Sequence, residues 1–280
     1  MGSTIDSAIT GIRDYGWQVL YASLFCLALE LTLPANRCSL QSRLRAAGFW
    51  SIYIIITATS FAFFNAVWAA LELKPFPHNL TSLTGSESLW LKIAGWTIAA
   101  IAAITVGEFF YYWFHRLHAV PFLWKFHEVH HSIREMSGLN SNHHFTEEIF
   151  RIPFVIVPLS LLINVNTGYI PALVYAILRL QGQFQHSCTR YHLGPLRCVI
   201  ADNRFHRIHH SLEEQHWDKN FGSFTSVWDL IFRTAHFPKK GEWPDVGLPY
   251  IDEPRTIREF LLRPFNNGKS PSQYMSSFHP

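Results

Sequence analysis

Charged residues are scarce in this chain of 280 residues. Asp, Glu, Lys and Arg make up 15% of it, whereas an ordinary soluble domain carries roughly 25%. Hydrophobic residues make up 49%, and the deficit of charge is concentrated in particular stretches. This distribution favours membrane segments over a large soluble core. The net charge of +3 is small and dispersed, so no nucleic-acid partner is predicted.

Paired cysteines are also missing. The four cysteines, Cys26, Cys38, Cys188 and Cys198, form no C-x-x-C motif, so we expect neither a disulfide framework nor a cysteine-ligated zinc site. The first dozen residues lack a basic start followed by an apolar stretch, and no cleavable signal peptide is expected. The sequence also contains no haem-binding cytochrome module, flavin fingerprint or cysteine-rich ferredoxin pattern.

Apolar runs, in contrast, are long. Three of them approach or exceed the roughly 17–25 residues that a membrane-spanning helix needs, at 17–33, 46–73 and 89–114. A fourth apolar region, 152–185, is interrupted by a turn-like sequence at 164–168. We therefore expect an all-α integral membrane bundle with three spans plus a helical hairpin at about 150–185.

Histidine is abundant, and one pattern occurs twice. Residues 127–131 read H-E-V-H-H and residues 206–210 read H-R-I-H-H. On a helix, positions i, i+3 and i+4 share a face, so we expect each set of three histidines to point into a common cavity. Neutral imidazole is the commonest protein metal ligand, and all-nitrogen ligation suits zinc, copper, iron or nickel.

The number of histidines suits two metal ions, because a transition metal with open positions needs roughly four or five of them. The candidate ligands are His115, His118, His127, His130, His131, His144, His186, His206, His209 and His210. The pattern leaves His143, His192 and His216 undecided. We interpret His78, His236 and His279 as surface or packed residues.

Two other classes compete with this hypothesis. Residues His127 and His131 with Glu128 satisfy H-E-x-x-H, the motif of zinc proteases in which the glutamate is the general base. An intramembrane zinc metalloprotease is therefore the alternative, but it uses only two of the histidines, and Arg207 occupies the glutamate position in the second copy. A metal carrier or haem-binding membrane protein is the non-enzymatic alternative.

The order of motifs from about 108 to 237 resembles the membrane fatty acid hydroxylase and sterol desaturase superfamily. The resemblance rests on Y-Y-W-F-H-R at 111–116, P-F-L-W-K-F-H-E-V-H-H-S at 121–132, H-F-T-E at 144–147, F-Q-H-S at 184–187, F-H-R-I-H-H-S at 205–211, D-K-N-F-G at 218–222 and W-D-L-I-F-R-T at 228–234. Three features depart from it. His115 and His118 are one residue closer than usual, Glu108 stands where Asp is frequent, and Arg233 stands where Gly is frequent.

The resemblance implies a non-haem di-iron oxidoreductase that uses O2 to hydroxylate or desaturate a lipid of the fatty acyl, sphingolipid or sterol type. It implies that the ten candidate histidines hold two iron ions. Electrons would come from a separate donor of the cytochrome b5, ferredoxin or reductase type. Carboxylates often fix ligating imidazoles, and Glu108 and Glu147 are candidates for this role. The lipid, the choice of reaction and the oligomeric state stay open.

Basic residues set the expected orientation. The loop after the first apolar run contains Arg37, Arg43 and Arg45 and no acidic residue, so it faces the cytoplasm by the positive-inside rule. The third run then ends in the cytoplasm, and a hairpin keeps both histidine motifs there. We expect a cytosolic histidine-rich cap on a bacterial inner membrane or the endoplasmic reticulum.

The expected domains follow from the same pattern. They are an N-terminal transmembrane region at 1–107, a catalytic domain at 108–237 that includes the hairpin, and a cytosolic tail at 238–280. The tail carries an apolar stripe of Ile257, Phe260 and Leu261, for which we expect packing on the catalytic domain or contact with the membrane surface.

Overall fold

The computed structural model describes residues 2–71, 88–162 and 170–266, and every regular element in these ranges is helical. This confirms the all-α prediction for the described part of the chain. The elements are α1 (Gly2–Thr32), α2 (Leu40–Ala70), α3 (Leu89–Leu117), α4 (Pro121–His131), α5 (Phe145–Arg151), η2 (Ile152–Ile156), α6 (Val157–Leu162), α7 (Ile170–Phe184), η3 (Gly194–Cys198), α8 (Asn203–His209), η4 (Glu214–His216), α9 (Val227–Ile231), α10 (Ile257–Leu262) and η5 (Arg263–Phe265).

Helices α2 and α3 are long and apolar enough to cross a membrane, with a mean hydropathy of 1.7 in their most apolar windows. Only 22% and 28% of the residues in those windows are buried, whereas the core helix of a soluble protein would be mostly buried. Large apolar side chains such as Phe63, Trp90 and Ile101 are exposed instead. Exposed apolar surface of this kind indicates contact with lipid. The chain is therefore membrane-associated.

The first expected span lies within α1, which does not reach the apolarity of α2 and α3. Its last turns contain Glu30, a buried carboxylate that pairs with Arg43 on α2 at 2.6 Å. The other carboxylate oxygen accepts hydrogen bonds from the Gly138 and Cys188 backbone N–H groups at 2.7 and 3.2 Å. Glu30 thus ties α1 to the loops around the histidines, and the count of three spans stays a prediction.

The two limbs of the expected hairpin are helical, while its turn at 164–168 lies outside the described residues. The first limb, η2 and α6, packs on α3, and the second limb, α7, packs on both α1 and α3. Pro153 lies in η2, a π-helical turn. Because proline has no backbone N–H, it interrupts the α-helical hydrogen-bond ladder and permits such a widened turn.

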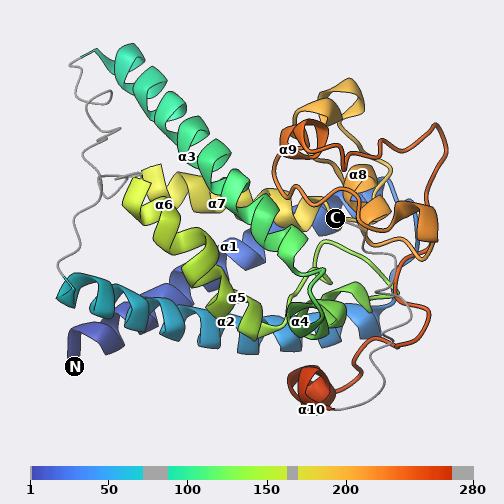
Figure 1. The fold of residues 1–280 in the computed structure, drawn as a ribbon, viewed down its shortest axis with the longest axis horizontal. Coiled ribbons are helices and arrows are strands. Elements are labelled where there is room, and N and C mark those ends of the chain that lie inside the picture. The colour runs from blue at the N-terminus through green and yellow to red at the C-terminus, as the bar shows by residue number, and fades with distance from the viewer. Residues whose placement is uncertain (1, 72–87, 163–169, 267–280) are drawn as a thin grey trace.

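The long helices and the hairpin meet at one end of the molecule, where the short helices and connecting loops form a cap (Figure 1). Helix α4 begins at Pro121, which suits the first helical position because its missing N–H would have no partner there. Helix α8 begins after Asp202, whose side chain accepts a hydrogen bond from the Phe205 N–H at 3.0 Å. These two helix starts place both H-x-x-H-H motifs inside the cap.

The C-terminal tail is part of this cap. Phe260 of α10 is fully buried and stacks on Phe49 of α2, with their ring centroids 4.4 Å apart. Val129 of α4 belongs to the same core cluster. Of the two alternatives for the apolar stripe, the structure therefore supports packing on the histidine-bearing domain for Phe260.

Candidate metal centre

Eight histidines gather in two groups of four inside the cap. Group 1 contains His115, His127, His131 and His209, and group 2 contains His130, His186, His206 and His210. Within each group the four ligand nitrogens all lie within 4.8 Å of one another. The groups adjoin, because the rings of His131 and His210 stack with centroids 4.4 Å apart.

Each H-x-x-H-H motif is divided between the two groups. Helix α4 contributes His127 and His131 to group 1 and His130 to group 2. The second motif, in α8 and the residue that follows it, contributes His209 to group 1 and its other two histidines to group 2. Helix geometry explains the division. Residues i and i+4 are about 40° apart around the axis, whereas residue i+3 lies about 60° to the other side of i. All three histidines of each motif still converge on the adjoining pair of groups, and the i+3 residue contributes to a different group from the other two.

Group 2 shows most clearly that its nitrogens suit a cation. His130 Nδ1 lies 3.2 Å from the Asn142 carbonyl oxygen, and His186 Nδ1 lies 2.6 Å from the Gly182 carbonyl oxygen. A carbonyl only accepts hydrogen bonds, so both neutral rings carry their proton on Nδ1. Their Nε2 lone pairs then face each other at 3.1 Å. Such lone pairs repel unless a cation lies between them.

The same geometry continues through both groups. In group 1, His127 Nε2 lies 3.0 Å from Nε2 of both His115 and His131. In group 2, His206 Nε2 lies 3.1 Å from His186 Nε2 and 3.2 Å from His210 Nε2. Nitrogens held at roughly 2.1 Å from one ion and at right angles are about 3.0 Å apart. The residues therefore fit one first-row transition metal ion per group.

Burial keeps these rings neutral, which metal binding requires. Burial, reinforced by neighbouring imidazoles, holds the pKa of both His127 and His130 well below its ordinary value. Burial also lowers the pKa of His186 and of His209 to about 4. At neutral pH these four side chains present lone pairs and carry no charge.

Backbone carbonyls and one carboxylate orient the group 1 rings. His115 Nδ1 lies 2.6 Å from the Phe221 carbonyl oxygen, and His209 Nδ1 lies 2.8 Å from the Lys219 carbonyl oxygen. His127 Nδ1 lies 3.0 Å from Glu147 Oε2. Partners of this kind fix the ring and aim the opposite nitrogen at a metal. Glu147, one of the two carboxylates singled out from the sequence, thus contacts a histidine of group 1.

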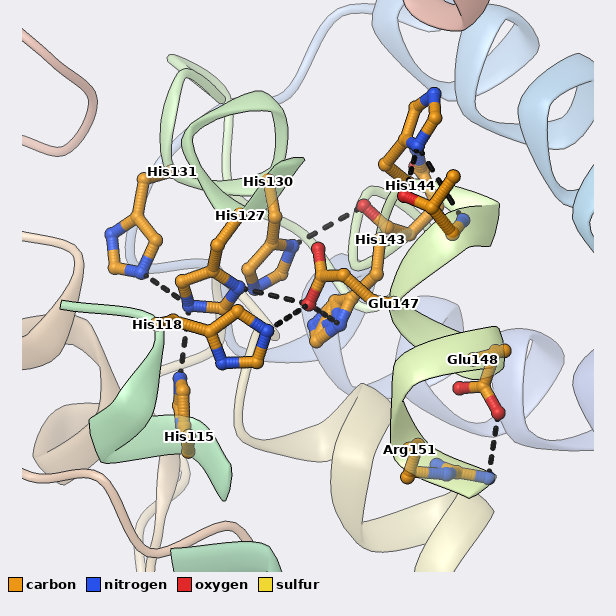
Figure 2. Close-up of polar contacts among 12 residues, drawn as sticks. His115, His118, His127, His130, His131, His143, His144, Glu147, Glu148 and Arg151 are labelled. Carbon is orange, nitrogen blue, oxygen red and sulfur yellow. Dashed lines mark hydrogen bonds and ion pairs between the residues drawn. The ribbon is translucent and has the colours of Figure 1, made fainter. Parts of the chain in front are cut away.

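His118 lies beside group 1 without belonging to it. Its ring stacks on His127 with centroids 4.4 Å apart, and its Nε2 lies 3.5 Å from Glu147 Oε2. Both ring nitrogens are buried and lack a hydrogen bond. Figure 2 shows His115, His118, His127 and Glu147 directed toward one another. An ion or ordered water would satisfy the His118 nitrogens, since buried polar atoms without partners are costly.

His144 lies apart from both groups, and Figure 2 shows its ring turned away from them. Its Nδ1 lies 2.7 Å from Thr146 Oγ1, at the start of α5, and its Nε2 lies 3.3 Å from the Leu261 carbonyl oxygen. Its neighbour His143, which the sequence leaves undecided, is the one that meets the site, with its ring centroid 3.8 Å from that of His130. The adjacent H-H pair was the only sequence signal for this position.

The remaining histidines divide into three situations. His192 Nδ1 accepts a hydrogen bond from the Gly194 N–H at 3.0 Å in a loop. His216 and His236 meet in a separate group with Glu242. The other two, His78 and His279, lie outside the described residues.

Glu108 supports a loop. Among the described residues, its hydrogen bonds go to backbone N–H groups and to no histidine ring. Its Oε2 accepts from the backbone N–H groups of Ser223, Phe224 and Thr225 at 3.2, 2.6 and 3.4 Å. This loop follows Phe221, whose carbonyl oxygen receives the His115 Nδ1 proton. Glu108 therefore acts on His115 only through the position of the backbone.

Asp229 supports the same loop, and sequence reasoning did not single it out. It accepts hydrogen bonds from the Phe221 and Gly222 N–H groups at 2.9 and 2.7 Å. Arg233 follows with a φ of +60°, a conformation that glycine adopts at lower cost. The backbone therefore keeps the turn that a glycine usually makes at this position, although the side chain differs.

The region that carries these residues is similar to a known protein family. Residues 100–234 match the family model described as fatty acid hydroxylase. The chain is 30% identical over 159 residues to the ornithine lipid hydroxylase OlsE of Rhizobium tropici. The matched segment covers 55% of this chain and 47% of the relative. It is 33% identical over 132 residues to alkylglycerol monooxygenase of Homo sapiens, and this match covers 45% of the chain and 28% of the relative.

A third relative is the fatty acid hydroxylase vlmA of Lecanicillium sp, 32% identical over 146 residues that cover 46% of this chain and 39% of the relative. The chain thus spans less than half the length of these curated relatives. No solved structure matches it significantly. The family match contains both histidine groups and both carboxylates, Glu108 and Glu147. Residues 100–234, which carry both histidine groups, match the membrane fatty acid hydroxylase superfamily.

Proposed function

We propose that this protein is a membrane-bound, O2-dependent oxidoreductase that hydroxylates a lipid with electrons from a separate donor. The observation that carries the proposal is the pair of buried four-histidine groups whose Nε2 lone pairs face one another. Two iron ions, one per group, would supply the activation of O2 that attack on an unactivated C–H bond requires. The relatives are hydroxylases and a monooxygenase, which favours hydroxylation over desaturation.

The chain's own residues prepare the site for this chemistry. The carbonyls of Asn142, Gly182 and Phe221 accept the Nδ1 protons of His130, His186 and His115, so these rings are held in one orientation. Burial of the surrounding rings excludes water, which would otherwise compete for the reactive position. The proposed cytochrome b5, ferredoxin or reductase-type donor would supply electrons from outside this chain.

Helix α3 gives a lipid a route to the site. Its apolar length reaches from the exposed Trp90 to His115, which belongs to group 1. Phe109, Phe110 and Trp113 line the last turns before that histidine. A fatty acyl, sphingolipid or sterol substrate would slide along this surface without entering water. The proposed orientation places the cap in the cytoplasm.

The metalloprotease alternative accounts for less of the structure. His127 and His131 of its motif do meet in group 1, but group 2 has no role in such an enzyme. Glu128, the expected general base, makes a side-chain hydrogen bond with Tyr250 and interacts electrostatically with Arg263, both in the tail. The lipid oxygenase therefore explains more of the buried residues.

Lipid analysis of cells that express the chain tests the proposal. We expect a lipid species heavier by one oxygen atom in cells with the parent chain, and none in cells with His130→Ala. A species lighter by two hydrogen atoms would assign desaturation instead. Purified protein that contains zinc in place of iron, and that cleaves peptides unless Glu128 is changed to Gln, would overturn the proposal in favour of the protease.

A further inference from the structure

A third cluster of metal-ligating side chains lies outside the two histidine groups. It contains His216 of η4 with His236 and Glu242 of the following loop. Glu242 Oε1 lies 3.2 Å from His216 Nε2 and 3.8 Å from His236 Nε2. We propose that these three residues bind a Zn²⁺ ion that clamps the two ends of loop 216–236. This site goes beyond the proposed lipid oxidation and does not depend on it.

The imidazole of His216 is aimed at this position. The side chain is 0% exposed, and its Nδ1 lies 2.9 Å from Ser211 Oγ, which fixes the ring. Its Nε2 is buried and lacks a hydrogen bond, and the same holds for His236 Nε2. Both nitrogens face the same Glu242 oxygen, but neither makes a well-formed hydrogen bond with it, and such buried polar atoms are costly. A cation shared with the Glu242 carboxylate satisfies both.

The ligand set favours zinc. Two imidazole nitrogens and one carboxylate oxygen form a three-ligand zinc site that leaves the fourth position to water. Ligands at roughly 2.1 Å in a tetrahedral site are about 3.4 Å apart, and the separations of 3.2 and 3.8 Å bracket this value. The side chains of His236 and Glu242 are 26% and 19% exposed, so an ion can enter from solvent. The sequence pattern alone had placed His236 among surface or packed residues.

The segment between His216 and His236 contacts group 1, so a metal ion bound at its two ends would affect that group. It carries the carbonyls of Lys219 and Phe221, which accept the Nδ1 protons of His209 and His115 in group 1. Asn220 already joins this segment to the far end of the loop, because its Oδ1 accepts from the His236 N–H at 2.7 Å. A metal bound by His216 and His236 would fix both ends and thereby hold the two carbonyls against group 1.

Metal titration of the purified full-length protein tests the site. Iron-loaded parent protein is titrated with Zn²⁺, and with Co²⁺ as an optical probe, alongside Glu242→Gln and His236→Asn. Glu214→Gln and His192→Asn serve as matched controls, because they change an exposed residue of each type outside the cluster. We expect the parent and both controls to bind one Zn²⁺ per chain beyond their iron and to gain thermal stability, and both cluster variants to lose that binding.

The inference fails if the parent binds no such ion, or if both cluster variants bind it as the parent does. Either result would leave only an ion pair between Glu242 and the two histidines. Iron content is measured in each sample to verify the fold. If Glu242→Gln does not retain iron, the Zn²⁺ binding of His236→Asn decides, because His236 is partly exposed and its replacement disturbs the packing less. The readout needs no lipid turnover, so an absence of lipid oxidation would contradict the proposed function and leave the zinc result intact.

Discussion

Two buried imidazoles of the cap, His127 and His144, differ in what their ring nitrogens contact. His127 Nε2 faces two other Nε2 atoms at 3.0 Å. The nitrogens of His144 instead face Thr146 Oγ1 and the Leu261 carbonyl oxygen. Protein oxygens therefore satisfy His144, whereas the Nε2 of His127 faces only other imidazole nitrogens and is proposed to bind a metal ion. This contrast separates ligands from packed histidines better than the number of histidines does.

Replacing these two histidines by glutamine tests that distinction. We expect His127→Gln to lose bound iron, because it removes a nitrogen from the centre of group 1. We expect His144→Gln to retain iron and to unfold at a lower temperature, because only packing and hydrogen bonds change. Elemental analysis and thermal unfolding of both purified variants measure this. Equal iron loss in the two variants would contradict it.

The carboxylate of Glu147 gives a second test at this scale. Glu147→Gln should weaken metal binding by about 10- to 100-fold, the usual effect of removing a group that orients a ligating histidine. Glu148→Gln is the matched control, because Glu148 follows on the same helix and pairs with Arg151 at 2.8 Å instead. Competition with a chelator measures both affinities. An unchanged affinity in Glu147→Gln would remove its assigned role.

Residue types and spacing could predict which histidines to consider and which of them share a helix face, but not which ring nitrogen points into the site. The H-x-x-H-H spacing predicted helices, and both occur as α4 and α8. The aim of Nε2 in His130 and His115 depends on the carbonyls of Asn142 and Phe221, which lie 12 and 106 residues away in the sequence, whereas the carbonyl that orients His186 belongs to Gly182, four residues before it. Backbone carbonyls occur at every position, so no sequence pattern marks these three.

At the scale of elements, the tail helix α10 connects the membrane part to the histidine-bearing helix α4. Phe260 is packed between Phe49 of α2 and Val129 of α4. The apolar stripe predicted a helix that packs somewhere, but two surfaces were equally suitable from periodicity alone. The choice depends on a cavity that forms only when α2 and α4 meet.

Truncation of Phe260 measures this connection. Phe260→Ala should lower the free energy of unfolding by about 3–5 kcal/mol, as is usual for a buried phenylalanine. Ile257→Ala on the same helix is the control, because Ile257 is exposed and exposed truncations cost little. Thermal or denaturant unfolding in detergent compares the two. If both variants were as stable as the parent, α10 would not be part of the folded cap.

At the scale of the whole molecule, two of the three expected spans correspond to long apolar helices, and the third stays a prediction. The runs at 46–73 and 89–114 correspond to the apolar helices α2 and α3. The run at 17–33 lies in α1, where the buried Glu30 serves the cap through Arg43. In the hydropathy pattern Glu30 only interrupts an apolar run, whereas in the structure its ion pair and hydrogen bonds hold α1 against α2 and the cap. The prediction that the cap lies on the cytoplasmic side of the membrane rests on the arginines of one loop.

Cysteine labelling tests the orientation of the whole molecule. Cys198 lies in η3 of the cap and is exposed, whereas Cys26 and Cys188 are buried. If the cap faces the cytoplasm, a membrane-impermeant maleimide should leave Cys198 unmodified in intact cells and modify it in inverted membrane vesicles. Cys198→Ser should lose the vesicle signal, which assigns the labelled thiol. Modification in intact cells would place the histidine groups on the opposite face and would reverse the positive-inside assignment.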